Sequence, residues 1–166
     1  MKKRLVPVVV LVLASALVWV LVTGLKTEAL AAPGEKAPDF ALQDTDGNTV
    51  TLSEFQGQKV VLNFFATWCE PCIDEAPELE AFGREFEGAE LLIIAKGETK
   101  RRIAGYIEKS GSELPYLLDT REKVSSDYNV IGQPETIIID EDGIIQERFT
   151  GPTTKEKLIE MIQGLK

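Results

Sequence analysis

Residues 59–72 read Lys-Val-Val-Leu-Asn-Phe-Phe-Ala-Thr-Trp-Cys-Glu-Pro-Cys, and this segment constrains the architecture more than any other. Its first half is a continuous apolar run, which is typical of a strand buried on both faces, so we predict a strand over 59–65. Apolar residues then recur at helical spacing and predict a helix over 71–86. They are Ile73, Ala76, Leu79, Phe82 and Phe86. Both cysteines therefore lie where a buried strand passes into a helix.

Alternating strands and helices are predicted on both sides of this segment. Towards the N-terminus, residues 37–43 and 49–52 alternate around an Asp-Gly turn signal and predict a hairpin. Towards the C-terminus, the pattern predicts strands at 91–95, 136–140 and 144–149, and helices at 99–109, 121–128 and 153–163. This order indicates an α/β fold whose central sheet has helices on both faces.

Composition excludes several classes of function. The 166 residues are 44% hydrophobic and 27% charged, as in a globular protein. Two cysteines are too few for a disulfide-rich scaffold, and the absence of His excludes His-based triads, His metal sites and covalent haem attachment. A net charge of −9 argues against binding to nucleic acid.

Residues 1–26 have a composition unlike the rest of the chain. Met-Lys-Lys-Arg precedes residues 5–25, which carry no charge, and about 20 apolar residues suffice for a helix to cross a bilayer. We therefore predict one transmembrane helix that anchors the chain in the cell membrane, with its basic N-terminus in the cytoplasm. The alternative is a cleaved signal peptide with its site at Ala29-Leu30-Ala31. Both interpretations place the rest of the chain outside the cytoplasm. It consists of a tether, residues 27–36, and a folded domain, residues 37–166.

The Cys69-Glu70-Pro71-Cys72 motif predicts thiol-disulfide chemistry. Free N–H groups at a helix N-terminus favour a thiolate at Cys69, and Cys72 follows one turn later, close enough to form a disulfide. Pro71 sacrifices no helical hydrogen bond in the first turn. We predict that Cys69 is the exposed nucleophile and Cys72 the buried resolving thiol, with this disulfide as the redox centre and no separate cofactor.

Three other interpretations of the cysteine pair carry less weight. A structural disulfide across two residues closes too small a loop to stabilise the fold much. Half of a zinc site would need a second pair of ligands from another chain, so no metal is expected. Two core cysteines would be poorly placed at a corner between strand and helix.

The domain resembles the membrane-anchored thioredoxin-fold oxidoreductases of the TlpA/ResA type. The resemblance spans about residues 34–166. It rests on Ala-Pro-Asp-Phe-Ala-Leu at 37–42, the Asp-Gly turn at 46–47, residues 62–72, Glu75 with Pro77, and Gly-Gln-Pro-Glu-Thr at 132–136. It implies a thioredoxin fold with an added N-terminal hairpin. It also implies the reduction of apocytochrome c or other exported thiol proteins, with electrons from a CcdA-like membrane protein.

Residues around the motif take roles from the same resemblance or from their own chemistry. Pro134 matches the family's cis-proline, which shapes the substrate groove. Trp68 is expected to shield the active-site corner, with packing in the core as the alternative. Glu75, one turn after Cys72, matches an active-site glutamate that can relay a proton. Glu70 adds negative charge that opposes a thiolate, which favours a reductant. Glu98 lies in a loop that the family places near the site.

The chain also departs from the family pattern. Ile73 and Asp74 replace basic residues after the motif, and Glu135 replaces a common Thr after the cis-proline, so we expect a more acidic surface near Cys69. Two alternatives remain open: a broader envelope or sporulation thiol reductase or isomerase, and a redox-inactive docking module. A peroxiredoxin shares Ala-Pro-Asp-Phe, but Ala66 stands where its motif needs Thr.

Overall fold

The structure is a computed structural model that describes Ser15, Trp19 and residues 31–165. The predicted membrane anchor lies outside the described residues apart from Ser15 and Trp19, and so does the start of the tether. Among the residues that the structure describes, no helix is both long and apolar enough to cross a membrane.

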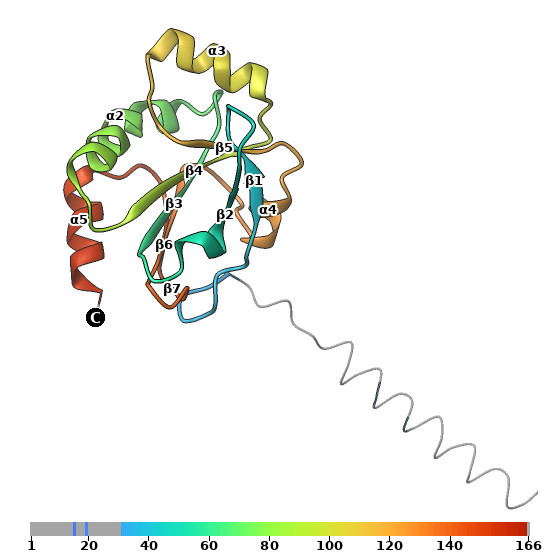
Figure 1. Cartoon of the computed structure of the whole chain (residues 1–166). Coiled ribbons are helices and arrows are strands. Elements are labelled where there is room, and N and C mark those ends of the chain that lie inside the picture. Colours follow the sequence, from blue (N-terminus) through green and yellow to red (C-terminus); the bar gives the residue numbers. More distant parts are fainter. Residues whose placement is uncertain (1–14, 16–18, 20–30, 166) are drawn as a thin grey trace, which may run out of the picture.

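A five-stranded mixed sheet forms the centre of the domain, in the order β5-β4-β3-β6-β7 (Figure 1). The central strand β3 (Val60–Phe65) is buried at every position, as its continuous apolar run predicts. It pairs in parallel with β4 (Glu90–Lys96) and antiparallel with β6 (Glu135–Ile139). β7 (Ile145–Thr150) pairs antiparallel with β6 and closes one edge.

The strand at the other edge, β5 (Tyr116–Asp119), was not indicated by the sequence pattern. It has four residues, follows Pro115, and pairs in parallel with β4 alone within the sheet. Pro is confined to such edge or first-residue positions, because it cannot donate to a ladder. A run this short, directly after a Pro, carries too little periodicity to predict a strand.

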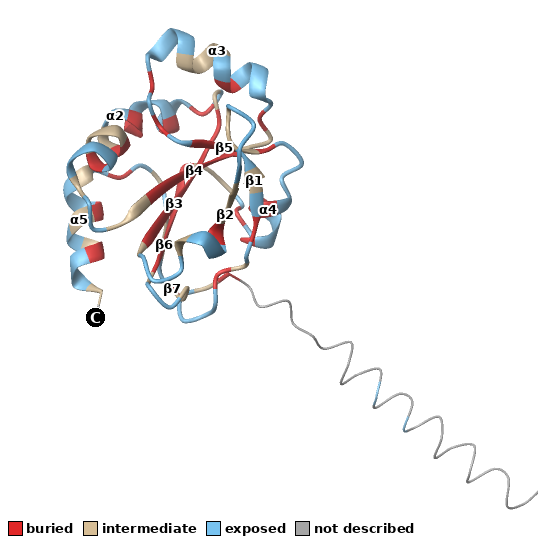
Figure 2. Cartoon of the chain, in the orientation of Figure 1, coloured by how far each residue is buried: buried red, intermediate tan, exposed pale blue. Residues whose placement is uncertain are grey.

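Helices cover both faces of the sheet, which confirms the predicted layers (Figures 1 and 2). One apolar cluster joins the sheet to α2 (Glu70–Glu85), α3 (Lys100–Ser110) and α5 (Lys155–Gly164). The other face packs against α4 (Lys123–Asp127) and the N-terminal segment. That segment comprises the hairpin β1 (Ala41–Gln43) and β2 (Thr49–Thr51) and the 3₁₀ turn η2 (Leu52–Phe55). The added hairpin is therefore confirmed.

Candidate active site

Cys69 and Cys72 form a disulfide at the N-terminus of α2. Cys69 is the N-cap residue, and the backbone N–H of Cys72 points at its Sγ at 3.3 Å. When the disulfide is reduced, this N–H and the positive end of the helix dipole favour the thiolate of Cys69. The strand β3 ends at Phe65, so a rigid buried strand sets the position of the motif.

The two cysteines differ in exposure less than the sequence suggested. Cys72 is completely buried, as predicted, but Cys69 is only 6% exposed. The prediction of an exposed nucleophile was therefore wrong in degree, although Cys69 is the more accessible of the two. The carbonyl oxygen of Gln133, 3.6 Å from the Cys69 Sγ, occupies one side of the sulfur.

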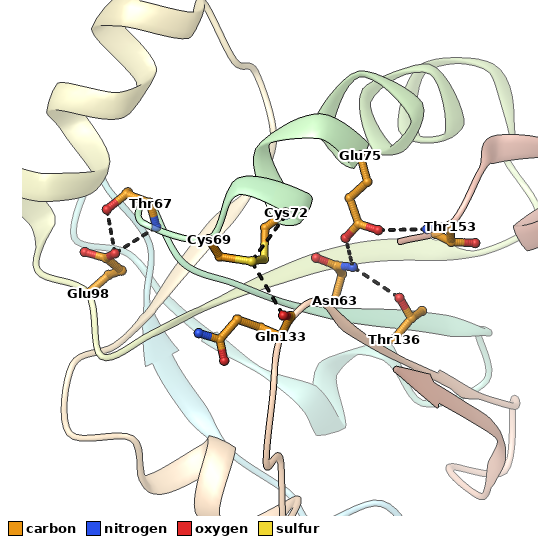
Figure 3. Close-up of a disulfide and its surroundings, with 9 residues drawn as sticks. All are labelled: Asn63, Thr67, Cys69, Cys72, Glu75, Glu98, Gln133, Thr136 and Thr153. Carbon is orange, nitrogen blue, oxygen red and sulfur yellow. Dashed lines mark hydrogen bonds between the residues drawn. A yellow bond between two sulfur atoms is a disulfide. The ribbon is translucent and has the colours of Figure 1, made fainter. Parts of the chain in front are cut away.

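The Gln133–Pro134 peptide bond is cis, as the resemblance implied. Pro134 is buried, and its carbonyl oxygen accepts a hydrogen bond from the N–H of Gly151 at 2.8 Å. This arrangement places the Gln133 carbonyl beside the Cys69 sulfur (Figure 3). A reduced Cys69 thiol would have this carbonyl as an acceptor.

Glu75, one turn after Cys72 on α2, belongs to a buried polar cluster to one side of the disulfide (Figure 3). Its two carboxylate oxygens accept hydrogen bonds from the Asn63 side-chain amide at 2.8 Å and from the Thr153 backbone N–H at 2.9 Å. The same amide also donates to the Thr136 hydroxyl at 3.1 Å. Residues from β3, α2, β6 and the segment before α5 thus converge on one carboxylate.

Burial raises the pKa of Glu75 above its ordinary value of 4.5, and this effect outweighs the hydrogen bonds from Asn63 and Thr153, which lower it. A carboxyl group with a raised pKa exchanges its proton nearer to neutral pH. That property suits a group that accepts a proton from a neighbouring thiol.

We expect Asn63→Asp to destabilise the protein by about 3 kcal/mol at pH 7, the usual cost of an uncompensated buried charge. The substitution places a second buried carboxylate against Glu75, and two such groups favour sharing one proton. The loss of stability caused by Asn63→Asp should therefore become smaller as the pH falls towards 4.5. Urea unfolding at both pH values measures it.

Thr136→Val is the matched control for this prediction, because it removes the other bond of the same amide and adds no charge. It should cost about 1 kcal/mol, the net value of one hydrogen bond, at both pH values. An Asn63→Asp loss that did not change with pH would contradict the predicted carboxylate pair.

Glu98 forms a second buried cluster on the other side of the disulfide (Figure 3). One of its carboxylate oxygens accepts hydrogen bonds from the backbone N–H and the hydroxyl of Thr67, at 2.8 and 2.6 Å. Its other oxygen lies 3.8 Å from the Arg102 guanidinium. Glu98 therefore holds the segment two residues before Cys69, in agreement with the position that the resemblance implied. No pattern in the sequence indicated that Thr67 is its partner.

Several residues close in sequence to Cys69 and to Pro134 are exposed. Trp68 is 68% exposed, so it is not packed in the core, and Ile131 is 88% exposed on the segment that leads to Pro134. Glu70 and Pro71 also lie at the surface, at the start of α2. Asp74, two residues after Cys72, is exposed as the sequence suggested, so the segments that carry the nearly covered Cys69 sulfur and Pro134 present apolar side chains and the carboxylates of Glu70 and Asp74.

Glu135 does not contribute to the acidic surface that the sequence suggested. It is 3% exposed and forms an ion pair with Arg148 of β7. The expectation was wrong because Glu135 belongs to β6 and its side chain points into the face that α4 covers. Arg148 was missed altogether, since a charged residue in a short edge strand resembles any solvated side chain.

No group of three or more Cys, Asp or Glu side chains within the described part of the chain is arranged to hold a metal ion. The chemistry that this arrangement supports is the making and breaking of the Cys69–Cys72 disulfide.

Comparisons with known proteins agree with this chemistry. A model of the AhpC/TSA family matches residues 33–148. The thiol-disulfide oxidoreductase ResA of Geobacillus kaustophilus is 36% identical over 95% of this chain and 92% of its own length. The thioredoxin-like protein YneN of Bacillus subtilis is 33% identical over 95% of each.

Solved structures give the same result. The exposed lipoprotein thioredoxin Etrx1 of Streptococcus pneumoniae superimposes with a TM-score of 0.71 at 27% identity, over 77% of this chain and all of its own. A thioredoxin-family thiol:disulfide interchange protein of Chlorobium tepidum gives 0.69 at 26% identity, over 80% and 96%. The chain therefore belongs to the thioredoxin-like AhpC/TSA family and is a thiol-disulfide oxidoreductase related to ResA and YneN.

Proposed function

We propose that this protein is an extracytoplasmic reductant that keeps exported thiols reduced, with apocytochrome c as its main substrate. The carboxylates near the disulfide, Glu70 at the surface and Glu75 buried, carry the proposal. Strong oxidants of this fold stabilise their reduced thiolate, and negative charge near the sulfur has the opposite effect. The local charge therefore favours the release of electrons to a substrate.

Each of the two cysteines has a separate step in the proposed reaction. The Cys69 thiolate attacks a substrate disulfide, forms a mixed disulfide with one substrate sulfur and releases the other as a thiolate. Cys72 then loses its proton to Glu75 and attacks the Cys69 sulfur, which frees the second substrate thiolate. The substrate gains two electrons, and the protein is left with the Cys69–Cys72 disulfide.

The proposed substrate follows from the relatives named ResA and from the resemblance described above. A cytochrome's Cys-x-x-Cys-His cysteines must be reduced before haem attaches, and a CcdA-like membrane protein would resupply the electrons. Residues 5–25 would anchor the domain on the outer side of the cell membrane, within reach of the two proposed partners.

Deletion of the gene tests this substrate. We expect a strain that lacks it to lose most of its haem-stained cytochrome c, and to recover it with the wild-type gene or with an added small-molecule thiol. Cys69→Ser should fail to restore the cytochrome. Glu85→Gln, which alters only a distant ion pair with Lys155, should restore it. Normal cytochrome c in the deletion strain would contradict this substrate and favour a broader envelope or sporulation reductase.

A peroxidase function is the alternative that the AhpC/TSA match itself raises. Peroxiredoxins use a Thr hydroxyl three residues before their cysteine, whereas this chain has the completely buried Ala66 there. The absence of that hydroxyl favours disulfide exchange over peroxide reduction. A rapid loss of hydrogen peroxide with the reduced protein would contradict this.

A further inference from the structure

Arg148 of β7 connects segments that are far apart in the sequence. Its Nε donates to the carboxylate of Glu135. Its two terminal nitrogens donate at 2.7 to 2.9 Å to the backbone carbonyl oxygens of Ala31, Tyr128 and Asn129. Because a guanidinium is a rigid planar fork, these bonds fix the acceptors relative to one another.

All of these acceptors except Ala31 lie at the ends of the segment that faces the disulfide. We define residues 130–134 as the cis-proline loop. Tyr128 and Asn129 come immediately before this loop, and Glu135 comes immediately after it. Within the loop, the carbonyl of Gln133 lies 3.6 Å from the Cys69 sulfur. One side chain thus holds both ends of the loop that covers the reactive sulfur.

The sheet gives this pair a fixed geometry. Glu135 is opposite Thr150, and Arg148 is opposite Ile137, so the two charged residues are diagonal neighbours on antiparallel strands. Glu135 is 3% exposed and Arg148 is 20% exposed. Apolar residues can often replace a buried ion pair without loss of stability, so stability alone does not explain why this pair is present. The other hydrogen bonds of Arg148 all go to backbone carbonyl oxygens, which indicates a role in positioning the backbone.

We propose that Arg148 and Glu135 are positioning residues that set the cis-proline loop for docking of a polypeptide substrate. The proposal rests on thiol-disulfide exchange and does not depend on which exported protein is the substrate. An extended polypeptide can pair with backbone groups of the loop, as in strand addition. A small disulfide reagent needs only the Cys69 sulfur. Displacement of the loop should therefore slow the reduction of a polypeptide disulfide and leave the reaction with a small disulfide reagent unchanged.

Arg148→Lys in the full-length chain separates the two contributions of the guanidinium. Lysine keeps a positive charge opposite Glu135 but offers one nitrogen, which cannot reach all of the carbonyls. We expect the reduced variant to reduce a synthetic peptide with a Cys-x-x-Cys disulfide about tenfold more slowly, because small displacements of a positioning group cost rates of this order. The rate at which the variant reacts with 5,5′-dithiobis(2-nitrobenzoate), a small disulfide reagent, should stay within about twofold of the wild-type rate.

Two further variants complete the test. Glu135→Gln keeps an acceptor for the Arg148 Nε and should retain most of the peptide rate. Glu85→Gln removes an ion pair with no contact to the loop and should match wild type. A cooperative thermal transition for each variant shows that it is folded.

The inference is overturned if folded Arg148→Lys reduces the peptide as fast as wild type. It is also overturned if both rates fall equally, because that would show a general loss of the site. Failure of the wild-type protein to react with either probe would instead contradict the oxidoreductase activity. Loss of the peptide rate alone supports the proposal whether or not apocytochrome c is the substrate.

Discussion

Cys72→Ala will remain covalently joined to its substrate through Cys69. Without the second thiol, the mixed disulfide has no intramolecular attack to resolve it, and multiple turnover should stop. The chain has two cysteines, so Cys69 is the only one left in this variant and the substrate must be joined to it. Non-reducing electrophoresis of trapped complexes, followed by mass spectrometry, measures this and names the partner.

Cys69→Ala is the matched control, since it removes the attacking sulfur and should trap nothing. An apocytochrome peptide on Cys69 would support the proposed substrate, and many different exported proteins would favour the broader reductase. Folded Cys72→Ala protein that forms no mixed disulfide would contradict the proposed mechanism and favour a docking module.

Glu75→Gln should slow disulfide turnover by about 100-fold at neutral pH, the usual contribution of a positioned general base. The carboxylate can accept a proton only when it is ionised, and burial raises its pKa above 4.5. The wild-type turnover rate should therefore be low at pH values below the raised pKa of Glu75 and should increase as the pH rises through it. The rate of the Glu75→Gln variant should lack this increase, and its pH dependence should reflect only the ionisation of the cysteines.

Stopped-flow measurement of single turnovers across pH 4 to 9 tests this expectation. Glu85→Gln makes the same substitution in the last turn of the same helix and should reproduce the wild-type profile. A Glu75→Gln profile with the wild-type shape, merely scaled down, would show that Glu75 supports the structure and does not handle the proton.

Much of the fold follows from periodicity, because long elements repeat one pattern many times. The apolar run of β3 and the helical spacing in α2 were sufficient to place the cysteines at a strand-to-helix corner. The edge strand β5 escaped prediction because four residues after a proline carry little pattern. In addition, edge pairing is decided by a neighbouring strand that is distant in sequence.

The candidate site divides in the same way. Cys69 and Cys72 belong to one local motif, so their placement could be predicted from the sequence, whereas the cis bond of Pro134 was implied only by the family resemblance. The partners of buried charges could not be, since Glu98 meets Thr67 across 31 positions and Glu75 meets Thr153 across 78. Contacts of this kind depend on how the chain packs, which no local pattern encodes.

The central claim is that this protein acts as a reductant, and the midpoint potential of the Cys69–Cys72 pair tests it most directly. The measurement equilibrates the full-length chain with dithiothreitol buffers and quantifies the free thiols. We predict a value near that of thioredoxin, about −270 mV, because carboxylates near the disulfide oppose the reduced thiolate. A value near that of DsbA, about −120 mV, would contradict the account and mark the protein as an oxidant.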